Sequence, residues 1–296
     1  MTLNNIATRQ NEQTFIDRLA AQRNLYSKAK RLSVLLFLVS VLIPVVLAIA
    51  KVILPSFDFL PKFIVVYSVV ATLMRIWLKD LASKKKTLAA RIQQLFDCEL
   101  FDLSWNKPLC EDKPSPEDVF YALKGAKYSK LNDWYDPVVS ELPLSVGALV
   151  CMRTNVVYDQ SLRKSYSKWC YGLTIVAIIA VAVLGMINNT GMWDAFLYGF
   201  VPLLPLITWV IDLYKQHSAN IKALNNIETL INTGFTQAQK ERQVSLSTLD
   251  EIQNFIYIHR KTSYFVPDLF YKKKREKNEA ATHYGVRKVC DTYKLL

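Results

Sequence analysis

The chain has 296 residues, a formal net charge of +12 and a pI near 9.4, and 51% of its residues are apolar. This length allows one large or two ordinary soluble domains. The apolar residues, however, gather in a few long runs, and this distribution argues against a soluble protein.

Four apolar runs are long enough to be considered as membrane spans: residues 32–54, 63–78, 169–187 and 196–211. A bilayer core needs roughly 20 apolar helical residues, a length that the second and fourth runs reach with residues 59–61 and 192–195. Buried helices of a soluble core are the alternative, but such helices usually keep a polar stripe, and VAIIAVAVLGMI at residues 176–187 has none. The sequence therefore predicts an all-α membrane protein with four transmembrane helices in two hairpins, residues 32–78 and 168–212.

The positions of Lys and Arg predict the orientation of these hairpins. The turns at residues 55–61 and 188–194 contain no Lys or Arg, although Lys51 and Lys62 flank the first turn. By contrast, KDLASKKK at residues 79–86 and YKKKREK at residues 271–277 are strongly basic. Because cytoplasmic loops are enriched in Lys and Arg, we expect both hairpin tips to face outward. Residues 1–31, 79–167 and 213–296 would then be cytoplasmic and pack together as one helical domain.

Helical spacing continues beyond the apolar runs. Residues 11–31 predict a helix that leads into the first run, and the second run continues as a helix past Lys79. Ser115, followed by Pro116 and Asp118, is typical of a helix N-terminus, and we expect a helix over residues 116–130. After prolines at positions 137 and 143, a helix over residues 144–166 leads into the third run.

Two further boundaries are expected in the C-terminal segment. The helix that continues the fourth run should end near Gly234, because glycine often follows the last helical residue. Thr248 and Glu251 have the spacing of a second capping box, which would start another helix.

The sequence contains no recognisable catalytic motif. It has no H-E-x-x-H, Gly-rich phosphate loop or G-x-S-x-G, and its five cysteines form no C-x-x-C pair. Asp97, Glu99 and Asp102 could bind a metal ion, but carboxylates beside a basic segment more often form salt bridges. We therefore expect a binding or membrane-acting protein rather than an enzyme, without a metal or cofactor.

Basic and aromatic residues occur together in the cytoplasmic segments. Guanidinium groups bind phosphates and flat rings stack on bases, so this mixture suits a nucleotide. Anionic lipid head groups would explain the same charges, and on chemistry alone that alternative is slightly favoured. The candidate ligand-binding residues are Trp134, Tyr135, Arg153, Asn155, Arg163, Tyr257, Arg260 and Arg275.

Several segments together resemble one known family. They are ATRQNEQTFIDRLAAQRNLYSKAKR at residues 7–31, CELFDLSWNKP at 98–108, DWYDP at 133–137, CMRTNVVYDQSLRKSY at 151–166 and LDEIQNFIYIHRKTSYFVPDLFYKKKREKNE at 249–279. With the layout of two hairpins around a cytoplasmic helical middle, the chain resembles the SMODS-associating four-transmembrane effector domain over essentially its whole length.

This resemblance implies a role in anti-phage defence of the cyclic-oligonucleotide (CBASS) type. A CD-NTase would make a cyclic di- or trinucleotide, and the effector would bind it, form a homo-oligomer and permeabilise the lipid bilayer, causing abortive infection. The protein would be a multi-pass protein of the bacterial inner membrane with both termini in the cytoplasm, and no DNA or RNA polymer is expected as a partner.

The resemblance also suggests roles for the candidate residues. The four candidate arginines would hold phosphates, and Trp134, Tyr135 or Tyr257 would stack on a base. Two alternatives remain open: a constitutive small channel or transporter subunit, and a membrane-anchored scaffold whose basic tail docks on lipid.

Overall fold

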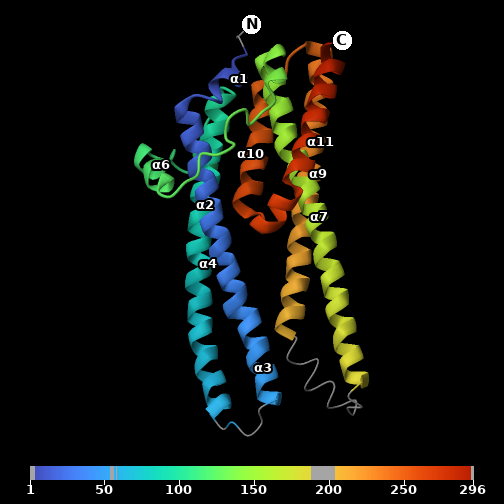
Figure 1. Cartoon of the computed structure of the whole chain (residues 1–296). Helices are drawn as coiled ribbons and strands as arrows, with labels where there is room; N and C mark the ends of the chain where they lie inside the picture. The colour runs from blue at the N-terminus through green and yellow to red at the C-terminus, as the bar shows by residue number, and fades with distance from the viewer. Residues whose placement is uncertain (1–3, 54–56, 58, 188–203, 295–296) are drawn as a thin grey trace.

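The computed structural model describes residues 4–53, 57, 59–187 and 204–294, and these residues form helices and connecting loops without a β-strand. Two pairs of long helices extend side by side from a helical head, and both ends of the chain lie at the far end of that head (Figure 1). The expected all-α class is confirmed. The expected second turn, residues 188–194, and the first part of the fourth run lie outside the described residues.

The first pair consists of α2 (Gln13–Phe37), η1 (Leu38–Leu42), α3 (Ile43–Ile53) and α4 (Phe59–Leu100). Helix α4 packs along α2 and is unbroken past Lys79, as its spacing predicts. The segment η1 is a π-helical turn directly before Pro44. Because proline has no N–H to donate to the carbonyl four residues earlier, the wider turn accommodates it within a continuous helical path.

The second pair consists of α7 (Leu144–Ile187) and α9 (Leu204–Glu241). Both helices run from the head into the apolar part of the molecule without a break in the described residues. The two pairs meet where the ring centroids of Phe37 and Trp209 lie 4.5 Å apart.

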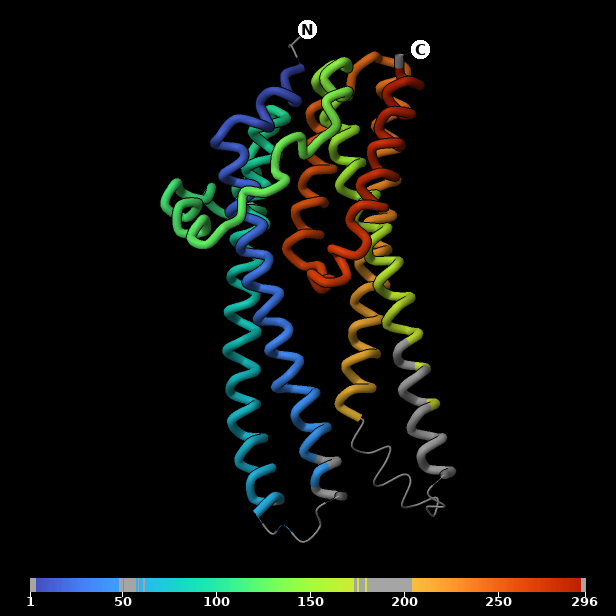
Figure 2. The backbone as a smooth tube through the Cα atoms, viewed as in Figure 1, coloured from blue at the N-terminus to red at the C-terminus, as the bar shows by residue number. Residues whose placement is uncertain are grey.

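The head is built around α10 (Leu246–Thr262), which lies between the two pairs and contacts α4, α7 and α9. Helix α11 (Asp268–Lys294) packs on α7. The short helices α1 (Ile6–Arg9), α5 (Lys107–Cys110), α6 (Pro116–Leu123) and the 3-10 turn η2 (Pro137–Glu141) complete the head. The backbone trace shows the loop from α6 crossing the head to reach α7 (Figure 2).

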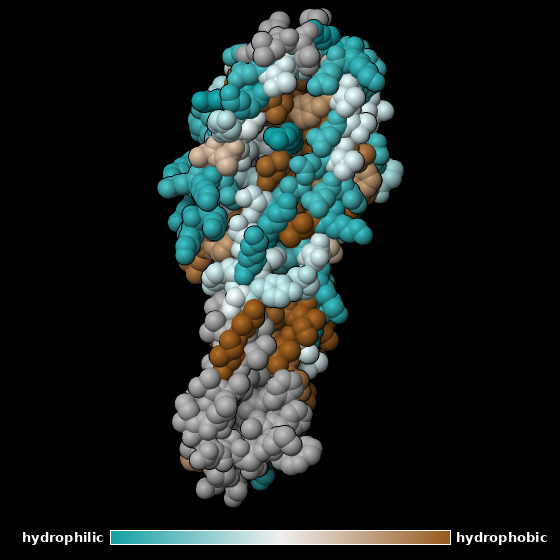
Figure 3. All heavy atoms as spheres, turned by 90° about the vertical axis from the view of Figure 1, so that its right-hand side faces the viewer, coloured by the Kyte–Doolittle hydropathy of each residue, from teal (hydrophilic) through white to brown (hydrophobic). Residues whose placement is uncertain are grey.

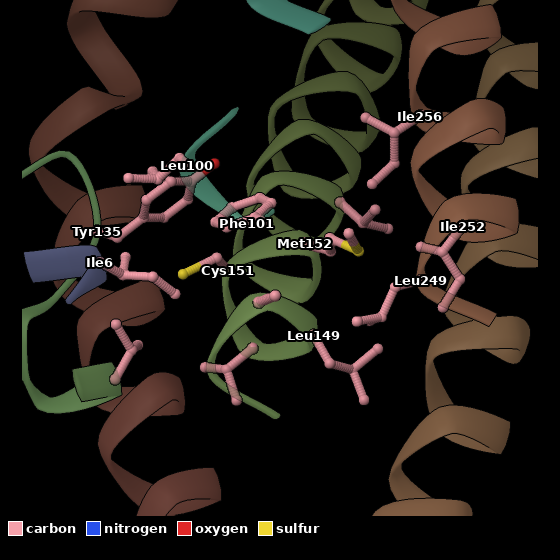
Figure 4. Packing of buried hydrophobic residues seen from close by; sticks show 14 of the residues in the cluster. Ile6, Leu100, Phe101, Tyr135, Leu149, Cys151, Met152, Leu249, Ile252 and Ile256 are labelled. Carbon is pink, nitrogen blue, oxygen red and sulfur yellow. The ribbon is translucent and has the colours of Figure 1, made fainter. Parts of the chain in front are cut away.

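The hydrophobic core of the head is centred on the first turns of α7. Residues 146–152, VGALVCM, are buried on all sides, as expected for a helical segment without a polar stripe. Leu149, Cys151 and Met152 lie between Tyr135 on one side and α10 on the other (Figure 4). A Cβ at Gly147 would lie 3.0 Å from the carbonyl oxygen of Val139, so this close approach requires glycine.

Below the head, the helices expose apolar side chains. Val65 and Trp77 on α4 are 66% and 62% exposed, and Ile179 on α7 is 56% exposed. On the face drawn in Figure 3, polar residues predominate on the head and hydrophobic residues lie directly beneath it. Among the described residues one helical stretch, Gln13–Leu47, is both long and apolar enough to cross a bilayer by those two criteria.

Three expected boundaries were wrong or inexact. Helix α9 does not end near Gly234 but continues to Glu241, because the glycine gives Leu149 of α7 room to pack against α9. The residue that caps α10 is Ser245, which accepts a hydrogen bond from the Thr248 N–H, so Thr248 lies inside the helix.

The capping box at Ser115 and Asp118 is confirmed, but α6 ends at Leu123 rather than at residue 130. The reason is Gly125, whose φ of +81° takes the chain out of the helical path.

Candidate functional site

Polar side chains lie in the interior of the head, between the two helix pairs. Gln94 and Asp97 of α4, Arg163 of α7, and Gln253 and His259 of α10 are all buried. Burying such groups is unfavourable unless they find partners. Their contacts divide into two connected networks.

The first network is centred on Asp97, whose side chain is 1% exposed. It accepts hydrogen bonds from the Tyr135 hydroxyl at 3.1 Å and from Gln253 Nε2 at 3.0 Å, and it forms an ion pair with Arg260. Asn155 Nδ2 donates to the Tyr135 hydroxyl at 2.9 Å. Burial by itself lowers the pKa of Arg260, but Asp97, by its charge and its hydrogen bond, together with Tyr135 and Tyr26, outweighs this effect and holds the pKa above its usual value.

The second network is centred on Asp159 of α7. Its Oδ2 accepts from Arg163 Nε at 2.9 Å and contacts His259 Nε2 at 2.7 Å, while Arg163 Nη1 donates to the Tyr264 carbonyl at 2.7 Å. Burial opposes ionisation of Asp159, but the charge of Arg163 and the contact with His259 hold its pKa below the usual range. The Asp159 side chain nevertheless remains 27% exposed, so a solvent-accessible surface reaches this network.

Tyr26 of α2 lies near both networks, and its hydroxyl donates to Gln93 Oε1 at 3.3 Å. Burial raises the pKa of its hydroxyl, and the charges of Arg260, Asp159 and Asp97 all act on it. Part of the Tyr26 side chain nevertheless remains accessible to solvent. An aromatic side chain from the first helix pair therefore lies beside charged groups of α4, α7 and α10.

Basic residues from both helix pairs meet near this interior. The pKa of Arg23 on α2 is lowered, first by burial and then by the charge of Arg275 on α11, while Tyr271 and Glu279 act in the opposite direction. Lys30 Nζ of α2 lies 5.6 Å from the centre of the Tyr271 ring. The Arg23 guanidinium also donates to the Ser129 and Lys130 carbonyls at 2.8 and 3.2 Å, so the loop that follows α6 holds it in place.

Aromatic side chains accompany these cations. The ring centroids of Tyr158 on α7 and Tyr271 on α11 are 6.0 Å apart, and both residues are partly exposed. We call Arg23, Tyr26, Lys30, Tyr158, Tyr271 and Arg275 the interpair cluster.

Several buried polar atoms at this site have no hydrogen-bond partner within the described part of the chain. On α10 they are Gln253 Oε1, His259 Nδ1 and Arg260 Nη2. A buried donor without a partner costs about 1–3 kcal/mol. Arg260 Nη2 could donate to an anion that enters between the helix pairs.

The structure brings some of the eight candidate residues together and leaves others apart. Tyr135, Asn155 and Arg260 meet in the Asp97 network, Arg163 belongs to the Asp159 network, and Arg275 forms an ion pair with Glu279 at the interpair cluster.

Three candidate residues lie elsewhere. Tyr257 is fully buried in a small cluster with Ala90 and Cys110, and Trp134 packs against the main core. Arg153 points towards Gly285 of α11. The Tyr135 ring is also buried, at 1% exposure, so neither Tyr135 nor Tyr257 offers a face for base stacking in this conformation.

The DWYDP segment holds the head together. Asn11 and Asp133 pair at 2.8 Å, and the amide of Gln10 bonds both backbone polar groups of Tyr135. Asp136 accepts from Arg287 of α11 at 3.3 Å. The segment therefore connects the N-terminal arm with α11.

The three clustered carboxylates do not converge on one point. Asp97 pairs with Arg260, Glu99 with Arg18 at 2.7 Å, and Asp102 with Arg9 at 2.9 Å. Among the described residues no group of three or more metal-ligating side chains was found. The salt-bridge interpretation of these residues is confirmed.

Sequence reasoning missed the residues of α2. Arg23, Tyr26 and Lys30 are spaced by three and four positions and therefore share one helix face. This polar stripe could have been noticed in the sequence. No local pattern shows that it faces α11, however, because the contacting residues are far apart in the chain: Lys30 and Asp268 are separated by 238 positions.

The comparisons with known proteins agree with this architecture. Residues 4–289 match the family model of the SMODS-associating 4TM effector domain. A protein of Bacillus cereus described as a probable CBASS effector molecule is 24% identical over 284 residues, which cover 92% of this chain and 93% of that protein. No solved structure matches the chain. The chain therefore belongs to the SMODS-associating 4TM effector domain family, whose place is among the effectors of CBASS anti-phage defence.

Proposed function

We propose that this chain is a membrane effector that is switched on by a cyclic oligonucleotide made by a CD-NTase. The observation that carries this proposal is the interpair cluster, in which cations and aromatic rings of α2 lie beside those of α7 and α11. An anionic ligand there would accept charge-assisted contacts from Arg23 of α2 and Arg275 of α11. Lys30 and the orphaned Nη2 of Arg260 add two further donors.

The aromatic residues of the same cluster suit a nucleobase. Tyr26, Tyr158 and Tyr271 are partly exposed, unlike the buried rings of Tyr135 and Tyr257. Stacking on an aromatic ring is worth about 1–3 kcal/mol per base. The ligand would thus place its phosphates near the arginines and a base against one of these tyrosines, and the effector would need no catalytic centre of its own.

The loop between α10 and α11 offers a route from the ligand to the long helices. On one side Lys86 of α4 donates to the Ser263 carbonyl and Lys30 of α2 pairs with Asp268 at 2.7 Å. On the other side Arg163 of α7 donates to the Tyr264 carbonyl. Because this loop is attached to both helix pairs, a ligand that draws Lys30 or Arg163 to its phosphates would change the spacing of the pairs.

We propose that this change, in self-associated copies, permeabilises the inner membrane through four spans in two outward-facing hairpins. The exposed apolar side chains of α4 and α7 below the head support the membrane location. Shifting an equilibrium from 1:99 to 99:1 needs about 5.5 kcal/mol of differential binding. Two to four charge-assisted contacts at about 1.5–3 kcal/mol each would supply it.

Equilibrium binding tests the ligand directly. Purified full-length protein in detergent is titrated with a panel of cyclic di- and trinucleotides, and Arg23→Ala and Arg275→Ala are compared with Lys288→Ala, which removes an exposed cation of α11 away from the cluster. We expect one member of the panel to bind, with affinity reduced about 10-fold or more in the two arginine variants. Absence of binding by every member, or equal affinity in all variants, would contradict the proposal.

A further inference from the structure

The outer face of α10 carries an unpartnered hollow. Its lining comes from one stripe of the helix, Ser247, Asp250, Glu251, Asn254, Phe255 and Ile258, and its volume is about 460 Å³. Phe255 and Ile258 are 43% and 38% exposed, so apolar rings and methyl groups are in contact with water beside two carboxylates. The charge of this surface is thus opposite in sign to the net charge of the chain, which is +12.

A projection of opposite character lies on α6. Phe120 and Tyr121 are 71% and 72% exposed, and their ring centroids are 5.7 Å apart. Lys124 and Lys127 follow them and are exposed as well. Exposed neighbouring aromatic residues beside cations are typical of the anchors of protein interfaces.

Helix α6 stands out from the side of the head, far from the point where α3 and α4 approach each other (Figure 1). It also lies apart from α10, so a chain cannot place its own α6 in its own hollow.

We propose that α6 of one copy docks on the α10 hollow of the next. The occupant follows from complementarity within this one chain: Phe120 and Tyr121 would cover Phe255 and Ile258, and Lys124 or Lys127 would face Glu251. No ion-pair partner of these three charged side chains occurs among the described residues of the same chain. Because two different surfaces of each copy meet, the association is head-to-tail and extends to a ring or a row rather than to a two-fold dimer.

This inference names the surface for the self-association in the proposed function and rests on that function in this respect alone. It requires no nucleotide. Its test can therefore fail while nucleotide binding holds, and nucleotide binding can fail while the surfaces still associate.

Disulfide trapping in membranes tests the contact. Full-length chains with Tyr121→Cys and with Phe255→Cys are co-expressed in a Cys170→Ser background and treated with a mild oxidant. We expect a covalent dimer. The control pair, Lys288→Cys with Phe255→Cys, should give a yield of this dimer that is at least several-fold lower. A yield equal to the control overturns the proposal.

Charge reversal tests the same contact through other residues. Lys124→Glu with Lys127→Glu on the Tyr121→Cys chain should reduce the trapped dimer several-fold, and Glu251→Lys on the Phe255→Cys chain should restore it. All five changed side chains are exposed, so the fold is retained in each variant. A lower yield of trapped dimer that Glu251→Lys does not restore would overturn the pairing of α6 with α10.

Discussion

Asp97 shows how a single residue can be essential to this head without being catalytic. Its carboxylate is almost inaccessible to solvent and is held by Tyr135, Gln253 and Arg260 from two other parts of the chain. The net stabilisation by such a buried pair is small, because both charges lose their hydration. Removing one partner, in contrast, leaves the other charge buried and unpaired.

We therefore expect Asp97→Asn to lower the free energy of unfolding by about 3–5 kcal/mol. Asp102→Asn is the matched control, since its pair with Arg9 leaves the Asp102 side chain 55% exposed and should contribute less than about 1 kcal/mol. Denaturant unfolding of both variants in detergent measures the difference. Equal losses in the two variants would refute the importance of burial at Asp97.

His217 gives a prediction about pH. Its ring is 1% exposed and lies 5.1 Å from the Tyr166 ring. Burial, and then the charge of Arg163, lower the pKa of His217 from 6.5 to about 4. Between these values the unfolded chain binds the proton and the folded chain does not, so the histidine favours unfolding as the pH falls.

The stability of the wild-type protein should thus decrease from pH 6.5 towards pH 4 by up to about 1.4 kcal/mol per pH unit from this residue. His217→Phe lacks the titrating group and should show a shallower decrease. Asp159 adds little to the slope between pH 7 and pH 5, because its lowered pKa affects stability only where the unfolded carboxylate starts to bind a proton, below about pH 5. Parallel thermal-shift curves at pH 7, 6 and 5 measure both slopes, and identical slopes would show that His217 is not responsible.

The residue scale is also where sequence reasoning was weakest. Four of the candidate residues, Asn155, Arg163, Arg260 and Arg275, lie at or near the interior between the pairs. The motifs could not show that Arg260 pairs with Asp97, because these residues are 163 positions apart and no local pattern couples them. Burial of Tyr135 and Tyr257 likewise depends on packing between distant helices.

At the scale of the helix, α7 combines two different environments. Its first turns are the centre of the core, and its later turns expose apolar residues such as Ile175 and Ile179. Two of its glycines lie in these contrasting places. A Cβ added at Gly147 would meet the Val139 carbonyl and the Asn4 amide, whereas a Cβ added at Gly172 would meet no atom within 4 Å.

Replacing each glycine by alanine should have opposite effects. Gly172→Ala should stabilise the protein by about 0.5–1 kcal/mol, because alanine restricts the unfolded chain more than glycine. Gly147→Ala should destabilise it by about 1–3 kcal/mol, because the new Cβ would displace η2 and Asn4. Unfolding midpoints in detergent measure both, and a stabilising Gly147→Ala would contradict the close packing of the N-terminal arm.

Helices were predictable from the sequence, and their ends were predictable only where the signal was local. The capping box at Ser115 is made by residues three positions apart, and it formed as expected. Gly234 failed as a helix end because Leu149, from another helix, packs against it. A long-range contact thus overrode a local signal.

At the scale of the whole molecule, the central feature is the division into a polar head and long apolar helices. Both termini lie at the head (Figure 1), so a head in the cytoplasm would place both termini there. The basic segments that start at Lys79 and Lys272 both lie on the head side of the exposed apolar side chains of α4 and α7. This arrangement agrees with the orientation that the charges predict.

Labelling with a membrane-impermeant maleimide tests that orientation. In a Cys170→Ser background, Phe57→Cys should react in intact spheroplasts, because residue 57 lies between α3 and α4 at the expected outward tip. Lys288→Cys on α11 should react only after the membrane is opened. Reaction of Lys288→Cys in intact spheroplasts would reverse the orientation.

The central claim is that a ligand bound between the two helix pairs opens the membrane. Dye-loaded liposomes that contain the purified full-length protein test it most directly, when they are challenged with the panel of cyclic di- and trinucleotides. The account predicts release by one member of the panel, abolished or reduced at least tenfold in Arg275→Ala and unchanged in Lys288→Ala. Release without any nucleotide, or no release with a nucleotide that demonstrably binds, would contradict it.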